Sequence, residues 1–225
     1  MDAAKNIKSD NDASRILWQP SEERIKSSNI TTFITRLNKI YNLAINGYDA
    51  LWEWSNKESE SFWSEIWDYA SIIGDKGTET LIDKDKMPGA VFFPNASLNY
   101  AENLLRRRDN ALALIFRDEK GLETQYTYHS IYEQVSLWQQ ALKEAGVEKG
   151  DRVAGYLPNM PETIIAMLAT SSLGAVWSSD SPDFGVQGVL DRFGQIEPKI
   201  LIGVDAYYYN GKVIDCLSKI KEIVP

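Results

Sequence analysis

The second half of the chain alternates short apolar runs with segments in which apolar side chains recur at helical spacing. Residues 151–157, 175–178 and 200–204 are the apolar runs, and the last is rich in the β-branched residues that favour strands. The segment after the first run begins at Pro161, where a helix needs no N–H donor, and stops at Gly174. Strands that alternate with helices in this way predict parallel pairing through helical crossovers.

A parallel sheet of this kind binds ligands beyond the carboxyl ends of its strands. The residues that follow the three predicted strands would line that crevice. They are residues 158–160, residues 179–183 and the chain from Asp205 onward. A binding site on this part of the molecule is therefore expected in those three loops.

The N-terminal part of the chain has the pattern of amphipathic helices. Thr31 or Thr32 is expected to cap the first helix, and Gly47 to end it. A short helix follows, and Ser55 with Glu58 fits a capping box that would open the next one. We interpret the aromatic stripe on that helix as its buried face, with a ligand-stacking surface as the alternative. The stripe comprises Phe62, Trp63, Ile66, Trp67 and Ala70.

Between these helices and the parallel strands, the pattern predicts a loop, a short helix, a hairpin and a long helix. Residues 74–96 hold glycines and prolines and are predicted to form a loop, in which Phe92-Phe93-Pro94-Asn95 would be a buried anchor. The short helix is expected over residues 99–107. Two strand-like runs meet around Lys120-Gly121, which predicts a β-hairpin, and the long helix that follows stops at Gly146.

The chain closes with a predicted turn at Asn210-Gly211 and an amphipathic helix that carries Ile214, Leu217, Ile220 and Ile223. The fold class is therefore α/β, a βαβαβ subdomain with a parallel sheet, a β-hairpin and an α-helical N-terminal extension. A crossover helix at the end needs a strand to return to, so we expect the front part of a longer protein. The expected division is a disordered tail at 1–15, the helical extension at 16–109 and an incomplete α/β subdomain at 110–225.

Net charge, cysteine content and the lack of long apolar runs limit the kinds of molecule that the protein is expected to bind and the compartment in which it is expected to act. The net charge of -8 argues against nucleic acid or an anionic membrane as the main partner. Cys216 is the only cysteine, which excludes an internal disulfide and favours a reducing compartment. No run approaches the roughly 18 apolar residues of a membrane span, and the first 15 residues do not resemble a secretion signal. We therefore expect a cytoplasmic protein that acts on small molecules.

Few side chains point to chemistry by themselves. His129 is the only histidine and lies at the start of the long helix, where a capping or surface position is favoured over catalysis. Cys216 lies between apolar residues, so a core thiol is favoured over a nucleophile. The run Arg106-Arg107-Arg108 fits a solvated helix end, with a phosphate clamp as the alternative.

The acidic loop after the second strand is open to two interpretations. Asp180 and Asp183 could hold a hard cation, or they could cap the next helix, and we favour capping. Neither a G-x-G-x-x-G fingerprint nor a Walker-type phosphate loop occurs in the sequence. No metal ligand and no catalytic residue can be assigned from the residue pattern alone.

Several longer stretches resemble the acyl-CoA synthetases of the adenylate-forming superfamily. The second half resembles their first α/β subdomain, in Lys149–Val153, Leu157–Glu162, Ala166–Ala169 and Leu173–Val176. Tyr48–Trp67 and Pro94–Asn103 resemble the N-terminal extension of the acetyl-CoA and acetoacetyl-CoA synthetase branch. Within that branch, Trp177–Gly185 and Asp191–Lys199 are similar to the acetoacetyl-CoA synthetases, and the Phe-Gly-Gly-Phe loop of the acetyl-CoA enzymes is missing. Asp180 departs from the small residue, usually cysteine, of the family.

The resemblance implies an AMP-forming ligase. ATP and acetoacetate would give an acyl-adenylate and pyrophosphate, and the thiol of coenzyme A (CoA) would then release AMP. The intact enzyme would use ATP, CoA and magnesium. The family's phosphate loop, magnesium-binding glutamate, ribose-binding aspartate and catalytic lysine do not occur in residues 1–225. The chain is therefore expected to be inactive alone and to bind none of these ligands tightly.

The resemblance carries over only a small set of site residues. In the acetyl-CoA branch, a basic segment after the third strand contacts the phosphoadenosine end of CoA. Tyr209-Asn210-Gly211-Lys212 matches that segment, with Lys212 keeping a positive charge and Tyr209 standing where an arginine is expected. Ser181-Pro182-Asp183 would lie near the same end of CoA. An ordinary turn with a surface lysine is the alternative for 209–212. For the whole chain, the alternative is a non-catalytic CoA- or nucleotide-binding module, or an interaction module.

Overall fold

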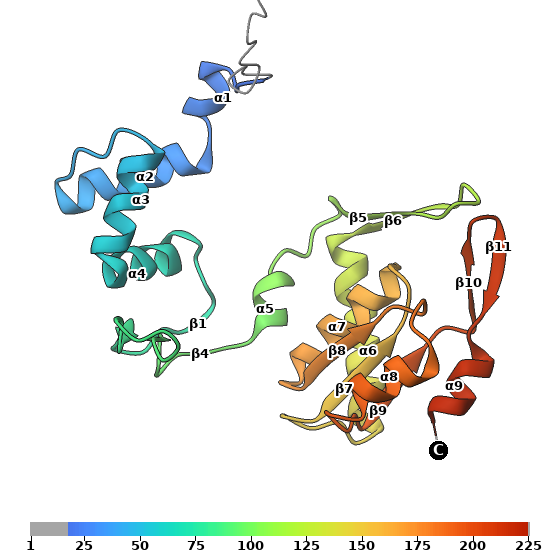
Figure 1. Cartoon of the computed structure of the whole chain (residues 1–225). Coiled ribbons are helices and arrows are strands. Elements are labelled where there is room, and N and C mark those ends of the chain that lie inside the picture. Colours follow the sequence, from blue (N-terminus) through green and yellow to red (C-terminus); the bar gives the residue numbers. More distant parts are fainter. Residues whose placement is uncertain (1–17, 225) are drawn as a thin grey trace, which may run out of the picture. The chain divides into compact units, whose positions relative to one another are not determined.

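The computed structural model describes residues 18–224, which form two compact units (Figure 1). The first unit comprises the described residues up to Ser71 together with Thr78–Pro94. The second comprises Ile72–Gly77 and the chain from Asn95 onward. The tail predicted for residues 1–15 lies outside the described residues.

The first unit is a group of helices around a small apolar core. Phe33, Leu37, Ile45 and Leu51 are buried there, and Phe62 and Ile66 of the aromatic stripe pack against them. These two residues, together with Trp67, which packs on Phe93, lie on the covered side of the helix, whereas Trp63 is 40% exposed. The elements of this unit are α1 (Glu22–Lys26), α2 (Asn29–Tyr41), α3 (Tyr48–Lys57), α4 (Ser59–Tyr69), β2 (Leu81–Ile82) and β3 (Val91–Phe92).

Several helix ends in this unit differ from the prediction. Ser28 caps α2, accepting from the Thr31 N–H at 3.3 Å, so the helix begins before either predicted threonine cap. It ends at Asn42, whose φ of 53° is left-handed, and not at Gly47. The predicted capping box is wrong: Ser55 lies inside α3, where its hydroxyl donates to a backbone carbonyl one turn earlier.

The predicted anchor Phe92-Phe93-Pro94-Asn95 is only partly buried: Phe93 and Pro94 are half-buried, Asn95 is exposed, and so is Phe92. Phe92 lies in the two-residue strand β3, which pairs with β2 in an antiparallel hairpin. This pairing is too short to cover the side chain, and Phe92 is 47% exposed. Its ring contacts Trp63 at 5.6 Å between centroids, and Trp63 is itself partly exposed.

The second unit contains the predicted parallel sheet. The strand order is β8-β7-β9, with both pairings parallel. The central strand β7 is the first in sequence, so the chain crosses it when it passes from β8 to β9. Right-handed crossovers then place the two connecting helices on opposite faces. The core elements are β7 (Arg152–Tyr156), α7 (Pro161–Ser172), β8 (Val176–Asp180), α8 (Val186–Phe193) and β9 (Ile200–Gly203).

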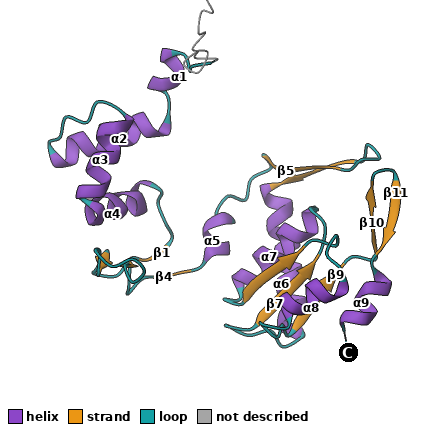
Figure 2. Ribbon diagram, in the orientation of Figure 1, coloured by secondary structure: helices purple, strands orange, loops and turns teal. Residues whose placement is uncertain are grey.

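The parallel sheet and the helices beside it are seen in Figure 2, and burial along β7 distinguishes the two faces of the sheet. Val153 packs into the cluster formed with α6 and α7, whereas Ala154 and Tyr156 pack with α8 and α9. This alternation follows from the two-residue period of a strand. The remaining elements of the unit are β1 (Gly74–Asp75), β4 (Ser97–Leu98), α5 (Tyr100–Leu104), β5 (Leu112–Arg117), β6 (Glu123–Thr127), α6 (Tyr128–Glu144), β10 (Ala206–Tyr209), β11 (Lys212–Asp215) and α9 (Leu217–Ile223).

Two antiparallel hairpins flank the parallel sheet in sequence. The β5–β6 hairpin confirms the prediction around Lys120-Gly121. The second, β10–β11, replaces the first turn of the predicted last helix, so Ile214 lies in a strand and α9 begins only at Leu217. Asn210 and Gly211 both have positive φ, 49° and 74°, which is the backbone of a tight hairpin turn. The turn favours a return strand over an early helix.

In the part of the chain that the structure describes, the helices are all too short or too polar to cross a membrane.

Candidate functional site

Three loops enclose a pocket of about 340 Å³ at the carboxyl ends of β7 and β9. Residues Pro158–Met160 form one wall, and Val204 with Ala206–Tyr208 at the start of β10 forms another, both in segments where the sequence predicts the crevice. The third wall is the end of β5 and its turn, Phe116–Glu119, which the sequence pattern does not place there. Residues 179–183 do not line this pocket, although Tyr207 in its wall contacts Asp183.

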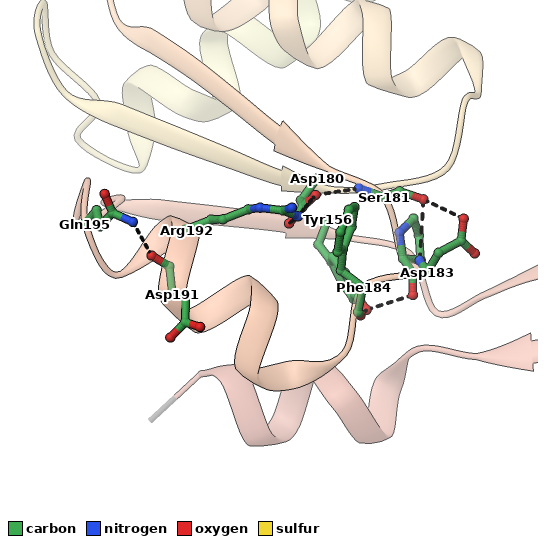
Figure 3. Close-up of polar contacts among 9 residues, drawn as sticks. Tyr156, Asp180, Ser181, Asp183, Phe184, Asp191, Arg192 and Gln195 are labelled. Carbon is green, nitrogen blue, oxygen red and sulfur yellow. Dashed lines mark hydrogen bonds and ion pairs between the residues drawn. The ribbon is translucent and has the colours of Figure 1, made fainter.

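The loop after β8 is fixed by an ion pair between the buried Asp180 and the half-exposed Arg192 (Figure 3). Strand β8 runs to Asp180, two residues beyond the prediction, and the Asp180 carbonyl accepts from the Leu157 N–H. Arg192 Nη1 donates to both Asp180 carboxylate oxygens, at 2.8 and 2.7 Å. The guanidinium carbon also lies 3.7 Å from the centroid of the Phe184 ring.

This geometry corrects the interpretation of the acidic loop. Helix α8 has Gly185 as its N-cap residue and no side-chain cap, so neither aspartate caps it. The described residues contain no group of three acidic, histidine or cysteine side chains arranged to hold a metal ion. Asp180 instead balances the charge of Arg192, a partner twelve residues away that periodicity could not select.

Tyr156 also anchors this loop, through hydrogen bonds to two of its backbone carbonyls. Its hydroxyl, on the carboxyl end of β7, lies 2.9 Å from the Pro182 carbonyl oxygen and 2.7 Å from that of Phe184. Burial raises the pKa of Tyr156, so the hydroxyl stays protonated and able to donate. Lys219 on α9 donates to the Pro182 carbonyl at 3.0 Å. The Pro182 side chain is fully buried, so of the predicted site residues here only Ser181 and Asp183 present side chains to solvent.

Asp183 links this loop to the β10–β11 hairpin. Its carboxylate accepts hydrogen bonds from the Tyr207 hydroxyl at 2.7 Å and from the Ser181 hydroxyl at 3.0 Å. These bonds stabilise the charged carboxylate and lower the pKa of Asp183. The bond between Tyr207 and Asp183 has the opposite effect on the phenol. It stabilises the protonated hydroxyl and so raises the pKa of Tyr207 to about 12.

The predicted segment Tyr209–Lys212 forms the turn of the hairpin. Tyr209 and Lys212 are paired across the strands and both are exposed. The Gly211 N–H donates to the Glu119 carboxylate at 2.8 Å, and the Lys120 ammonium lies 4.8 Å from the centroid of the Tyr208 ring. The turn therefore contacts the tip of the β5–β6 hairpin, which is 92 residues away in sequence.

The two groups of predicted site residues thus lie along one hairpin but at different points of it. Asp183 meets the hairpin at Tyr207, near its base, where Ala206 pairs with Asp215. Lys212 lies beside the turn at the other end. The structure connects the groups through β10 and does not pack them side by side.

The remaining candidates have structural partners. Helix α5 ends at Leu104, so the arginine run follows the helix: Arg107 pairs with Asp109 at 2.6 Å, and Arg108 lies 4.0 Å from the Tyr132 ring centroid. His129 is a half-exposed surface residue near Glu133, as expected. Cys216 is fully buried, and burial raises the pKa of its thiol, so the prediction of a core thiol is confirmed.

The model of the AMP-binding enzyme family matches residues 101–224, which cover the second unit from α5 onward. The chain belongs to the AMP-binding enzyme family. Residues 48–104 also match the family described as the acetyl-coenzyme A synthetase N-terminus. The predicted resemblance to adenylate-forming enzymes, with a separate N-terminal extension, is confirmed.

Similar proteins show which members of the family this chain resembles. The chain is 48% identical over 211 residues to an acetoacetyl-coenzyme A synthetase of Rhizobium meliloti, covering 94% of this chain and 32% of that protein. It is 37% identical over 239 residues to a malonamoyl-CoA synthetase of Penicillium aethiopicum, covering 99% and 33%. The solved acetoacetyl-CoA synthetase from Streptomyces lividans matches with a TM-score of 0.86 and 39% identity, over 93% and 33%. The chain spans about a third of the length of these proteins.

Proposed function

We propose that this chain forms the first α/β subdomain and the helical extension of an AMP-forming ligase that joins acetoacetate to CoA. The observation that carries the proposal is the 48% identity to an acetoacetyl-coenzyme A synthetase along 94% of the chain. The boundaries 16–109 and 110–225 for the two parts belong to the same proposal.

The reaction would proceed in two balanced steps. A carboxylate oxygen of acetoacetate attacks the α-phosphorus of ATP, and pyrophosphate leaves with the electrons of the broken P–O bond. The thiolate sulfur of CoA then attacks the acyl carbon, and AMP leaves. Both steps bring anionic partners together, so positioning and charge stabilisation are the main work of the protein.

Within this chain, the donors suited to an anion are at the β10–β11 turn. Lys212 offers an exposed ammonium, and Gly211 offers a backbone N–H at a position with positive φ. Tyr209 and Asn210 complete the segment that would face the phosphoadenosine end of CoA. Ser181, Pro182 and Asp183 would support it through the Asp183–Tyr207 hydrogen bond.

The groups that hold ATP and magnesium would come from the two thirds of the relatives that this chain does not match. The chain alone is then expected to release no AMP from ATP, acetoacetate and CoA. A chimera that joins this chain to the remaining two thirds of the Streptomyces lividans enzyme is expected to release AMP only when acetoacetate is present. AMP release by the chain alone, or a folded but inactive chimera, would contradict the proposal.

Substrate choice needs the polypeptide encoded by the whole gene, because the malonamoyl-CoA synthetase relative shows that similar sequences act on another short acid. We expect acetoacetate to give the highest kcat/KM when compared with malonamate, acetate and propionate. A preference for any of the other three acids would contradict the acetoacetate assignment. The charge balance and the family fit an enzyme of the cytoplasm, which fractionation of the producing cells would test.

A further inference from the structure

The tip of the β5–β6 hairpin places a carboxylate on the backbone donor of the β10–β11 turn. Glu119 Oε1 lies 2.8 Å from the Gly211 nitrogen. A phosphate oxygen bound at this turn would need the same N–H, because each backbone amide has only one donor hydrogen. Glu119 therefore takes the place that an anionic ligand would take.

The position of Glu119 is built into its own turn. Asp118 accepts hydrogen bonds from the Lys120 and Leu122 N–H groups, at 2.9 and 2.8 Å, which fixes the backbone on both sides of the tip. Lys120 is anchored on the Tyr208 ring at 4.8 Å. The tip of the β5–β6 hairpin lies near the β10–β11 turn (Figure 1), with the Glu119 carboxylate at Gly211 and the Lys120 ammonium over the Tyr208 ring of β10.

Charge at the turn depends on this one carboxylate. Lys120 and Lys212 belong to the two segments that meet here, and Glu119 adds a negative charge where the segments touch at Gly211. With the Glu119 side chain moved away, the Gly211 N–H would be open to a ligand, and the exposed ammonium of Lys212 follows it in the sequence. These are the donor types that bind phosphate groups in proteins.

We propose that Glu119 is an internal competitor for the anion site at the β10–β11 turn, so that a phosphate-bearing ligand binds there by displacing its carboxylate from the Gly211 N–H. The inference rests on the proposed function, since CoA is the phosphate-bearing ligand expected at this turn. Glu119 would weaken the binding of anions that have only one point of contact. It would thereby favour a ligand that also contacts Lys212.

The test is a titration of the 15N-labelled chain with CoA, followed by NMR, in the wild type and in Glu119→Gln. Loss of one exposed charge is expected to tighten CoA binding about 2- to 5-fold. Chemical shift changes should centre on Gly211 and Lys212, and the gain should shrink as salt is raised. In Glu119→Ala without ligand, the Gly211 amide resonance should move, because its acceptor is gone.

Glu123→Gln is the matched control. It removes the same charge from the same hairpin, but Glu123 pairs with Arg117 at 2.7 Å and does not contact Gly211. Equal effects of the two substitutions on CoA affinity would overturn the inference. CoA binding that depends on Lys212 but is unchanged in Glu119→Gln would also overturn it, while leaving the proposed CoA segment standing. If CoA perturbs neither Gly211 nor Lys212 in any variant, the CoA segment and the role of Glu119 fail together, whereas the ligase proposal is decided by the AMP-release assay.

Discussion

At the scale of single residues, the contacts that distinguish this molecule are polar and reach across long stretches of sequence. Asp180 is charge-balanced by Arg192, Asp183 accepts from Tyr207, and Glu119 accepts from Gly211. Each contact joins a loop at the strand ends to a different element. The loops are therefore held in place by specific partners as well as by the apolar core.

The Asp183–Tyr207 hydrogen bond predicts a displaced tyrosine titration. Tyr207 should titrate near pH 12, and Asp183→Asn should return it toward about 10, because the negative acceptor is lost. The measurement is 13C NMR of tyrosines labelled at Cζ, with Tyr207→Phe identifying the resonance. Asp191→Asn removes a charge from the neighbouring helix α8 and should leave Tyr207 unchanged. An equal shift in both variants would mean that net charge, and not the hydrogen bond, sets the pKa.

The same pair fixes the direction of the pH dependence of stability. The raised pKa of Tyr207 gives a contribution that is complete below about pH 10 and is lost as pH rises toward 12. The lowered pKa of Asp183 gives a contribution present above the ordinary aspartate pKa of about 3.9 and lost as pH falls below it. Denaturant midpoints of Tyr207→Phe and the wild type should therefore differ most at neutral pH and converge at both extremes.

The buried thiol of Cys216 provides a clean probe, because it is the only cysteine in the chain. Its reaction with Ellman's reagent should be about 100-fold or more slower in the native chain than in concentrated urea, since both burial and the raised pKa withhold the thiolate. Absorbance of the released thionitrobenzoate measures the rate. A native rate close to the unfolded rate would show that α9 opens readily from the sheet.

At the scale of the elements, the central strand β7 depends on a glycine. A Cβ added at Gly155 would lie 2.5 Å from Trp177 of the neighbouring strand β8, which is closer than side chains pack. Strand β7 is therefore adapted to let the indole of β8 cross its face. The hairpin turn at Gly211 shows the other use of glycine, a positive φ with open space around it.

Gly155→Ala is expected to destabilise the chain by about 1–3 kcal/mol, because the Trp177 ring must leave its rotamer or the strands must separate. Gly188→Ala is the matched control, since its Cβ would meet Phe184 at an ordinary 3.8 Å within helix α8. That substitution should raise stability by up to about 1 kcal/mol through helix propensity. Urea unfolding followed by circular dichroism measures both, and equal effects would contradict the packing argument.

At the scale of the whole molecule, the two compact units have separate apolar cores. Leu37 is fully buried in the first, and Val153 is fully buried in the second. Large-to-small substitutions at such positions cost about 2–5 kcal/mol in well-packed cores. The separation predicts that damage to one core need not spread to the other.

Leu37→Ala should accelerate amide hydrogen exchange across α2 to α4 and leave the protection of α6 and α7 close to that of the wild type. Val153→Ala should do the converse, because its neighbours belong to the cluster around α6 and α7. Mass spectrometry of peptides after exchange resolves the two regions. Loss of protection in both units from either substitution would show that they unfold as one cooperative body.

Local pattern alone determined much of this chain. The βαβαβ order, the parallel pairing, the β5–β6 hairpin and the stop at Gly146 follow from periodicity and from residues such as Pro and Gly whose backbone preferences are strong. Long motifs also identified the family, because together they extend over a whole subdomain. The first and last residues of helices were predicted less accurately, since a nearby serine such as Ser28 can cap a helix as well as a threonine can.

Only the tertiary structure decided the partners of the polar residues. The sequence offered Asp180 and Asp183 as cation ligands or caps, and folding paired them with Arg192 and Tyr207. It also brought Glu119 to Gly211, across 92 residues of chain. The physical reason is that periodicity fixes which face of an element a residue occupies, whereas a charged or hydroxyl group in a loop takes whichever partner the packed elements bring within about 3 Å.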